Sequence, residues 1–355
     1  MSEALKPLIP EVMPPPVVGG VVAEKHRYLK PVLSGAEGDV SRETLAPRDV
    51  TYVQMNARSV LNWSAEGAFE GCYTVNPYRG CELNCAYCYA RYTHEFLEHL
   101  DTNDFSRVIY VKRNAPKVLR RTLSPPRVRD KRIAVGTATD PYQPAERKFE
   151  ITRGILKELA RHEGLNVSVT TKSTLITRDL DVLRELDRRS SLTVYLSLVS
   201  LDRARIARLE PNAPTPEARL RAVETLARAG LHAGIHMIPL LPLLTDHRAN
   251  VEALAARAQD AGAVFVHAGF LSLKSTTKRH FFSFLQREFP HLLARYRRAY
   301  GSASQPPEAY TRRVRAMADA VLARYGFADV SDEEEETYEP EEAGAEPALP
   351  FGRAD

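Results

Sequence analysis

The sequence has no run of 18 uninterrupted apolar residues, although 44% of its 355 residues are hydrophobic. A helix that crosses a membrane needs about 20 such residues, so we expect none. The apolar stretch at residues 5–22 contains five prolines and lacks a basic beginning, which argues against a secretory signal. We therefore expect a globular protein of the cytoplasm with a sizeable core.

Cysteine is also scarce, because the chain has only four, all between Cys72 and Cys88. A disulfide framework spreads its cysteines so that they join distant loops. Clustered cysteines instead predict a metal site in a reducing compartment. No cysteine remains outside this segment to bind a second metal cluster.

Acidic residues are few in the body of the chain and many at its end. Residues 331–355 hold ten acids and one base, so the remaining residues carry 48 bases and 35 acids, a charge of about +13. A body this basic is compatible with a polyanionic partner such as nucleic acid, and equally with simple solubility. The tail itself has the composition of a disordered segment.

Composition and hydrophobic pattern divide the chain into four parts. We expect a proline-rich, loosely structured arm at 1–65, a main domain at 66–272, a helical extension at 273–330 and the disordered acidic tail at 331–355. In the extension, apolar residues at helical spacing predict packing against the main domain: Phe281, Phe282, Leu285 and Phe289.

Short β-branched runs alternate with helical patterns through the main domain. The predicted strands are Cys72–Asn76, Arg132–Thr137, Val167–Thr171, Leu192–Ser197, His232–Ile238 and Val264–Phe270, with Arg107–Lys112 as a further strand at an edge. The predicted helices are Ala86–His99, Thr152–Arg161, Asp179–Arg188, Pro216–Ala229 and Ala249–Ala261. Six strand–helix units indicate an α/β fold with a parallel sheet, an incomplete (β/α)6 barrel.

The three cysteines Cys81, Cys85 and Cys88 follow the first predicted strand with the spacing C-x3-C-x2-C. Three thiolates on one loop can ligate three irons of a [4Fe–4S] cubane and leave the fourth iron open. One alternative adds His94 to make a Cys3His zinc site, and the protein would then be a zinc-stabilised nucleic-acid-binding protein without redox activity. Another adds Cys72 as a fourth ligand, which would close the cluster.

This cysteine motif, with the aromatic Tyr87 before its last cysteine, resembles the signature of the radical S-adenosylmethionine (SAM) superfamily. Further segments resemble its spore photoproduct lyase-like branch, also labelled DNA repair photolyase-like. They are Asn76–Cys81, Tyr87–His94, Thr139–Glu146, Thr171–Ser173 with Arg178–Asp179, Ser197 with Leu201–Asp202, and Glu210–Pro211 with Arg219–Leu220. The similarity covers residues 70–272.

The resemblance implies a [4Fe–4S] cluster held by Cys81, Cys85 and Cys88, and SAM bound at the open iron. The cluster would cleave SAM reductively to a 5′-deoxyadenosyl radical, which abstracts hydrogen from an unknown substrate. It implies a reductant such as flavodoxin or ferredoxin. The expected SAM contacts are Tyr87, Thr139, Asp140, Lys172 and Ser197, with Lys172 on the cofactor carboxylate and Glu210 and Arg219 paired beside the site.

These expected contacts all follow predicted strands or end them. Because the carboxyl ends of parallel strands meet at one end of a barrel, the side chains should gather there. His232 and His236 lie on one face of a later strand, and we assign them no catalytic role.

Spore photoproduct lyase itself uses a cysteine hydrogen donor just after the second strand, where this sequence has Thr137. Either the substrate differs or a tyrosine is the donor. A basic run could clamp a nucleic acid near the barrel mouth: Lys112, Arg113, Lys117, Arg120, Arg121, Arg127, Arg129, Lys131 and Arg132.

Overall fold

The computed structural model describes residues 23–27, 49–65, 69–99 and 101–327. At its centre is a seven-stranded sheet in the order β11-β10-β9-β8-β7-β4-β3. Strands β4 and β7 to β11 run parallel, and β3 pairs antiparallel with β4 at one edge. Their bounds are β3 Leu61–Ser64, β4 Cys72–Val75, β7 Arg132–Val135, β8 Asn166–Thr171, β9 Ser191–Ser197, β10 His232–Leu240 and β11 Val266–Phe270.

The six parallel strands confirm the predicted incomplete barrel. A helix of at least nine residues follows each of β7, β8, β9 and β10, and these helices are α5 Ile151–Leu159, α6 Leu180–Arg189, α8 Pro216–Arg228 and α9 Arg248–Asp260. Helix α8 shows why its sequence is helical. The Thr215 hydroxyl accepts a hydrogen bond from the Ala218 amide at 3.3 Å, and Pro216 occupies the first turn.

The two faces of the parallel sheet differ in character. One face is aliphatic and fully buried, as Val169, Leu196 and Ile235 show. The other face carries polar and aromatic side chains such as Thr170 and Tyr195, which remain half-buried. Because side chains alternate along a strand, the first face packs on the helices and the second lines the inside of the partial barrel.

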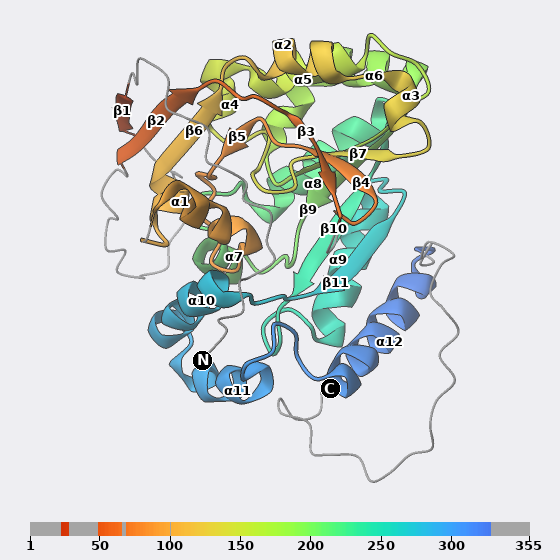
Figure 1. Ribbon diagram of the computed structural model, residues 1–355. Helices are drawn as coiled ribbons and strands as arrows, with labels where there is room; N and C mark the ends of the chain where they lie inside the picture. The colour runs from red at the N-terminus through yellow and green to blue at the C-terminus, as the bar shows by residue number, and fades with distance from the viewer. Residues whose placement is uncertain (1–22, 28–48, 66–68, 100, 328–355) are drawn as a thin grey trace, which may run out of the picture.

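A second sheet, in the order β1-β2-β6-β5, lies to the left of the parallel strands in Figure 1. Its bounds are β1 Ala23–Arg27, β2 Asp49–Met55, β5 Tyr78–Arg79 and β6 Val108–Lys112. The prediction that the β6 segment forms an edge strand is wrong, because β2 pairs with it on one side and β5 on the other.

The stretch 1–65, predicted as a loosely structured arm, contains strands in the part that the structure describes. Strands β1 and β2 belong to the second sheet, and β3 extends the main sheet. The pattern missed them because their partners are distant in sequence. Residues 1–22 and 28–48 of the arm, and the acidic tail at 331–355, lie outside the described residues.

The segment predicted as a helix at Ala86–His99 is a 3₁₀ helix, η2, that spans only Tyr89–Leu97. The cysteine loop occupies the residues before it in tight turns. The helical extension is present as α10 Ser275–Glu288, α11 Pro290–Tyr300 and α12 Glu308–Arg324, below the sheet in Figure 1. Phe281 and Leu285 of α10 are fully buried, as predicted.

Several short helices were not predicted: α1 Asp104–Arg107, α2 Ala115–Thr122, α3 Pro125–Val128, α4 Ala145–Phe149, η3 Thr174–Asp179 and α7 Arg203–Leu209. Among the helices that the structure describes, none has the length and apolar character needed to cross a membrane.

Candidate active site

The cysteine loop, residues 81–88, follows β4 and β5 at the carboxyl end of the parallel sheet. The Cys81 amide donates to the Phe105 carbonyl at 2.8 Å, and the Ala86 amide donates to the Leu209 carbonyl at 2.8 Å. Gly80, before the loop, has a φ of +82°, and a Cβ there would lie 2.8 Å from the Phe105 carbonyl oxygen. Only glycine permits this approach, so backbone contacts place the loop.

The loop also has side-chain supports that sequence reasoning missed. Gln143 accepts a hydrogen bond from the Glu82 amide at 2.9 Å and donates to the Gly80 carbonyl at 3.1 Å. Asn212 donates to the Glu82 carbonyl at 2.6 Å. The sequence did hold one signal for Gln143, because this residue lies within the Thr139–Glu146 segment that carries the family resemblance.

The three loop cysteines are free thiols. Cys81 and Cys85 are buried, and Cys88 is half-buried. Burial raises the pKa of Cys81 well above its usual value and that of Cys85 to about 12. A nearby cationic group is therefore needed to stabilise the thiolates. An iron–sulfur cluster meets that need, and three thiols on one loop provide the donor set that a cubane with one open iron requires.

The zinc alternative fits this geometry less well. His94 is buried, and its Nε2 lies 2.9 Å from the Val108 carbonyl oxygen. Within the described ranges, no group of three His, Cys, Asp or Glu side chains is arranged around a position for one metal ion. Cubane ligands bind different irons and need no such common point. Cys72, the other alternative ligand, is buried with its Sγ 3.6 Å from the Glu70 carbonyl oxygen.

Asp140 joins the loop after β7 to the end of β8. Its carboxylate accepts hydrogen bonds from the Thr171 hydroxyl at 2.6 Å, the Lys172 amide at 2.7 Å and the Tyr142 amide at 2.9 Å. Burial raises the pKa of Asp140, although these donors partly offset the effect. The observed role of Asp140 is to position the backbone of Lys172.

Thr139, beside Asp140, also has a partner within the protein. Its hydroxyl donates to the Gly80 carbonyl at 2.6 Å, so it ties the β7 loop to the cysteine loop. The contacts of Thr139 and Asp140 with SAM stay predictions.

Lys172 brings a positive charge to the cysteines. Its Nζ lies 5.6 Å from the centroid of the Tyr87 ring. Burial lowers the pKa of Lys172, but the negative charges of Cys85 and Glu210 outweigh burial, and the pKa is raised. The Lys172 ammonium has no hydrogen-bond or ion-pair partner among the residues that the structure describes. It therefore remains available to an anionic group.

Glu210 and Arg219 form the predicted ion pair, and both side chains are fully buried. Tyr87 donates its hydroxyl proton to Glu210. Arg219 also donates to the Ser197 carbonyl at 3.0 Å. The pair therefore connects the cysteine loop to the end of β9. Burial favours neutral Glu210, but Arg219 and Lys172 outweigh it and hold its pKa below the usual value.

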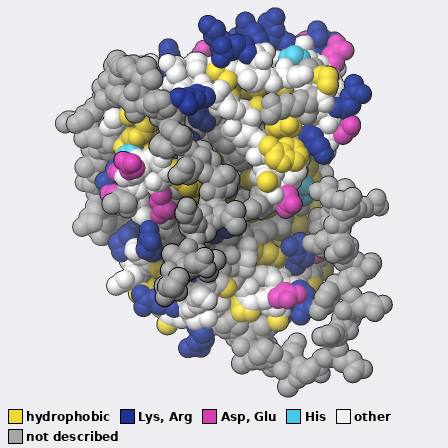
Figure 2. Space-filling view, in the orientation of Figure 1, with side chains coloured by type: hydrophobic (Ala, Val, Ile, Leu, Met, Phe, Trp, Pro, Cys, Tyr) yellow, Lys and Arg dark blue, Asp and Glu magenta, His cyan; other side chains and the backbone are white. Residues whose placement is uncertain are grey.

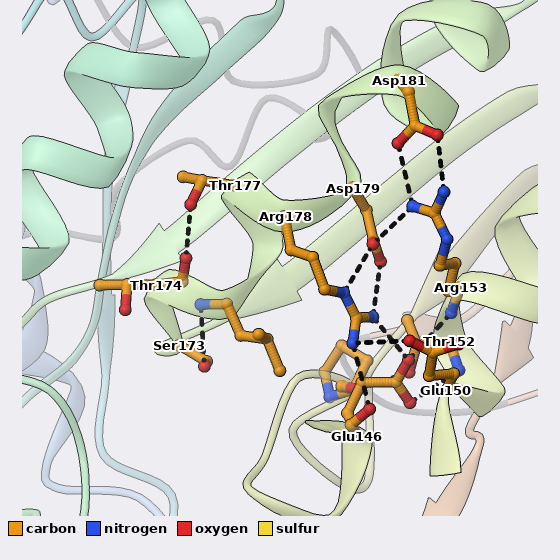
Figure 3. Close-up of polar contacts among 12 residues, drawn as sticks. Glu146, Glu150, Thr152, Arg153, Ser173, Thr174, Thr177, Arg178, Asp179 and Asp181 are labelled. Atoms are coloured by element: carbon orange, nitrogen blue, oxygen red, sulfur yellow. Dashed lines mark hydrogen bonds and ion pairs between the residues drawn. The ribbon is translucent and has the colours of Figure 1, made fainter. Parts of the chain in front are cut away.

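A second group of buried charges lies between the α4–α5 segment and the residues after β8 (Figure 3). Arg178 pairs with Glu146 at 3.2 Å and with Asp179 at 2.8 Å, and Arg153 pairs with Asp179 at 2.7 Å. Tyr78, just before the cysteine loop, donates to Glu146. The Arg178–Asp179 motif is therefore a scaffold element behind the site.

The later residues of the basic run do not line the barrel mouth as predicted. Lys112 is buried, and its ammonium donates to the Asn76 carbonyl at 2.7 Å. Arg132 begins β7, so the residues before it lie at the opposite end of the strands from the cysteines. The chain returns through α2 and α3 to the start of β7, which carries the charges at residues 129–132 away from the mouth. Arg127 has no described side chain.

Figure 2 shows Lys and Arg side chains gathered along the top of the molecule, where Figure 1 places α2, α5 and α6. Exposed members of this surface include Lys117, Arg121, Lys157 and Arg161.

Comparison with known proteins agrees with this geometry. The model of the Radical SAM superfamily matches residues 75–255. The uncharacterised protein Rv2578c of Mycobacterium tuberculosis is 36% identical over 290 residues, which cover 81% of this chain and 85% of the relative. The uncharacterised protein MJ0683 of Methanocaldococcus jannaschii is 29% identical over 218 residues, 61% of this chain and 76% of the relative.

Solved structures share the fold. Spore photoproduct lyase complexed with dinucleoside spore photoproduct has a TM-score of 0.55 at 14% identity, covering 77% of this chain and 79% of that one. A double mutant of that enzyme with bound AdoMet and dinucleoside spore photoproduct has a TM-score of 0.54 at 12% identity over the same shares.

The chain therefore belongs to the radical SAM superfamily, and its fold is that of spore photoproduct lyase. Members of the superfamily are enzymes that use a [4Fe–4S] cluster and SAM and that need a reductant. The [4Fe–4S] cluster and SAM are therefore the cofactors of this chain.

Proposed function

We propose that this protein is a radical SAM enzyme whose cluster is held by Cys81, Cys85 and Cys88. The observation that carries the proposal is the combination of three thiols on one loop, two of them buried, with the Lys172 ammonium beside them, which has no hydrogen-bond or ion-pair partner among the described residues. The cluster and SAM together supply one chemistry, a one-electron reductive cleavage that yields a 5′-deoxyadenosyl radical for hydrogen abstraction. Everything else is positioning by the protein.

Several residues share the task of positioning SAM. Lys172 binds the SAM carboxylate, because its ammonium lies near the loop and has no hydrogen-bond or ion-pair partner within the described ranges. Ser197 provides a hydroxyl at the end of β9, and Arg219 fixes its backbone through the 3.0 Å hydrogen bond. Tyr87 places its ring under Lys172, and its hydroxyl is committed to Glu210. The burial of the loop keeps water from the reacting atoms.

The reaction differs from spore photoproduct repair through a cysteine donor, because no cysteine lies outside residues 72–88. Thr137 occupies the region where that donor would lie. The Tyr89 hydroxyl donates to the Thr137 carbonyl, and the Tyr89 side chain is 43% exposed. A lyase-like reaction in this chain therefore acts on a different substrate or uses a tyrosine such as Tyr89 as hydrogen donor.

Anaerobic reconstitution with iron and sulfide tests the proposal. We expect a brown protein with broad absorbance near about 400 nm, which forms 5′-deoxyadenosine when SAM and dithionite are added. Flavodoxin or ferredoxin should replace dithionite, as expected for a cytoplasmic enzyme. A colourless protein that carries one zinc ion would contradict the proposal and favour the zinc-stabilised alternative.

A further inference from the structure

The helical extension carries a basic surface that the proposed function does not use. Residues 274–300, which include α10 and α11, hold seven Lys or Arg residues and one acidic residue, Glu288. Figure 2 shows Lys and Arg side chains at the lower left of the molecule, where Figure 1 places these two helices. We call the exposed basic residues of this stretch the α10–α11 surface: Lys274, Arg279, Arg287, Arg295, Arg297 and Arg298.

Most of this positive charge is not neutralised within the protein. Arg295, Arg297 and Arg298 form no ion pair with any residue that the structure describes. Glu288 pairs at 3.4 Å with Arg208, which belongs to α7 and is itself half exposed. The one acid of these two helices therefore offsets a charge on a third helix, and the α10–α11 surface keeps its positive charge. Arg279 of this surface does have an acidic partner, at 3.4 Å on η2.

The helices that carry these charges also contact the cysteine loop. The buried Thr277 hydroxyl of α10 donates to the Cys88 carbonyl at 3.3 Å. The Leu209 carbonyl at the end of α7 accepts a hydrogen bond from the Ala86 amide at 2.8 Å. Arg208, the residue before Leu209, points into solvent. A single layer of helix therefore separates the cysteine loop from exposed arginines.

This location indicates the kind of partner that the surface fits. The proposed function needs a reductant that delivers an electron to the cluster, and a protein reductant has to bring its own redox group close to the cysteine loop. The α10–α11 surface offers that proximity on helices, apart from the inner face of the sheet. A nucleic acid would also be attracted by the charge, but as a substrate it has to reach the inner face instead.

Resting on the proposed function, we propose that the α10–α11 surface, with Arg208 at its edge, docks a small electron-carrier protein whose redox group is surrounded by carboxylates. One electron passes from the reduced carrier to the cluster. The carrier is oxidised by one electron, the [4Fe–4S] cluster is reduced from the 2+ to the 1+ state, and no covalent bond forms or breaks. The basic residues steer and hold the carrier, so the complex is transient and sensitive to salt.

Charge reversal on the reconstituted full chain tests this proposal, with flavodoxin as the carrier. The double variant Arg208→Glu, Arg295→Glu should weaken flavodoxin binding about tenfold, measured by biolayer interferometry. Reduction of the cluster by flavodoxin hydroquinone, followed by stopped-flow absorbance, should slow by a similar factor. Cleavage of SAM driven by dithionite should be unchanged, because dithionite needs no docking surface. Added NaCl should weaken flavodoxin binding to the wild type more than to the variant.

The matched control reverses two charges on the opposite basic surface. Lys117→Glu with Arg161→Glu changes the net charge by the same amount as the test variant does. Arg161, like Arg208, is exposed and has one acidic partner, Glu158 at 3.9 Å. This control should change flavodoxin affinity by less than about twofold, because the charges lie far from the docked carrier.

A second measurement, on the wild-type protein, covers the case in which the double variant does not fold. A carbodiimide joins flavodoxin carboxylates to lysine amines as amides, with loss of water, and mass spectrometry locates the crosslinks. We expect them on Lys274, which is exposed just before α10, and not on the equally exposed Lys117 and Lys157.

The proposal is overturned if the double variant binds flavodoxin as the wild type does, if the control loses the same affinity, or if crosslinks fall on Lys117 or Lys157. Loss of DNA or RNA binding in the double variant, with flavodoxin binding intact, would assign the surface to nucleic acid and overturn it as well. Formation of 5′-deoxyadenosine by the wild type with dithionite is measured in parallel. Its absence would sink the proposed function, whereas its presence with any of these results would sink only the docking surface.

Discussion

Two groups of buried charges flank the cysteine loop, and they differ in whether each charge has a partner. In the group around Glu146, both carboxylate oxygens accept hydrogen bonds, and Arg178 and Arg153 share Asp179. In the group around Glu210, Arg219 and Tyr87 satisfy the carboxylate, while the Lys172 ammonium has no hydrogen-bond or ion-pair partner in the described part of the chain. The first group is complete without a ligand, and the second has spare positive charge.

The difference separates scaffold from binding site. A saturated buried network holds segments together, and removing one member leaves an unmatched buried charge. An unmatched ammonium beside buried thiols is costly unless a ligand completes it. We therefore expect changes in the first group to act on stability, and changes in the second to act on cofactor binding.

The largest effect should come from the cysteines themselves. Replacing Cys81, Cys85 or Cys88 by Ala removes one ligand of a three-ligand set, so cluster content and 5′-deoxyadenosine formation should fall to background. Iron analysis and absorbance near about 400 nm measure the loss. Cys72→Ala is the matched control and should retain the cluster. Loss of the cluster in that control as well would mean that Cys72 is a ligand.

Arg178→Ala should break the saturated group. Glu146 and Asp179 are fully buried, so they would lose a charge partner, at a cost of about 3–5 kcal/mol in the free energy of unfolding. Denaturant titration measures this, and SAM affinity of the folded fraction should stay within twofold. The exposed Arg188→Ala serves as control. A large loss of SAM affinity at normal stability would erase the distinction between the two groups.

Lys172→Ala should weaken SAM binding rather than lower the stability of the protein. Loss of a charged hydrogen bond to the SAM carboxylate should weaken SAM binding by about 1.5–3 kcal/mol, roughly 10- to 100-fold, with cluster absorbance retained. Lys148→Ala is the control, because Lys148 also lies over an aromatic ring, at 5.3 Å from the Phe149 centroid. Unchanged SAM affinity by calorimetry would reject the role of Lys172.

The buried Lys112 should also make the free energy of unfolding depend on pH. Burial lowers the pKa of Lys112 to about 7, below its value in the unfolded chain. Above pH 7 the unfolded state then binds more protons, so stability should rise with pH, by about 1 kcal/mol between pH 7 and 8. Urea titrations of the wild type and Lys112→Met measure it. An identical slope in both proteins would refute this assignment.

The smallest effect concerns the basic surface on α2. If this surface attracts nucleic acid, binding measured on filters should weaken steeply as the salt concentration rises. The double variant Lys117→Ala, Arg121→Ala should reduce the binding a few-fold. Addition of SAM should not change the binding. If SAM strengthened the binding of nucleic acid, the basic surface would instead be coupled to the SAM site at the barrel mouth. Absence of binding, or binding insensitive to salt, removes nucleic acid as a partner of this surface.

Local signals in the sequence were sufficient for the main fold and for the cysteine motif. The β-branched strands, the helix caps such as Thr215 and the C-x3-C-x2-C spacing are all properties of neighbouring residues, and each predicted parallel strand is present. The pairing of β6 between β2 and β5 was not predictable, because partners 31 to 57 residues apart decide it. The position of the basic run was misjudged for a similar reason, since the path of the chain to the start of β7 decides which end it reaches.

The sequence alone thus established the superfamily, the three thiols and the order of the barrel, because these depend on residue identity and short spacing. Tertiary structure alone showed that Asp140 accepts a hydrogen bond from the backbone of Lys172, that the Lys172 ammonium is unpartnered among the residues the structure describes, and that His236 lies beside Ser197. Hydrogen-bond saturation and register across a sheet depend on atoms brought together from distant segments, and no local pattern encodes them.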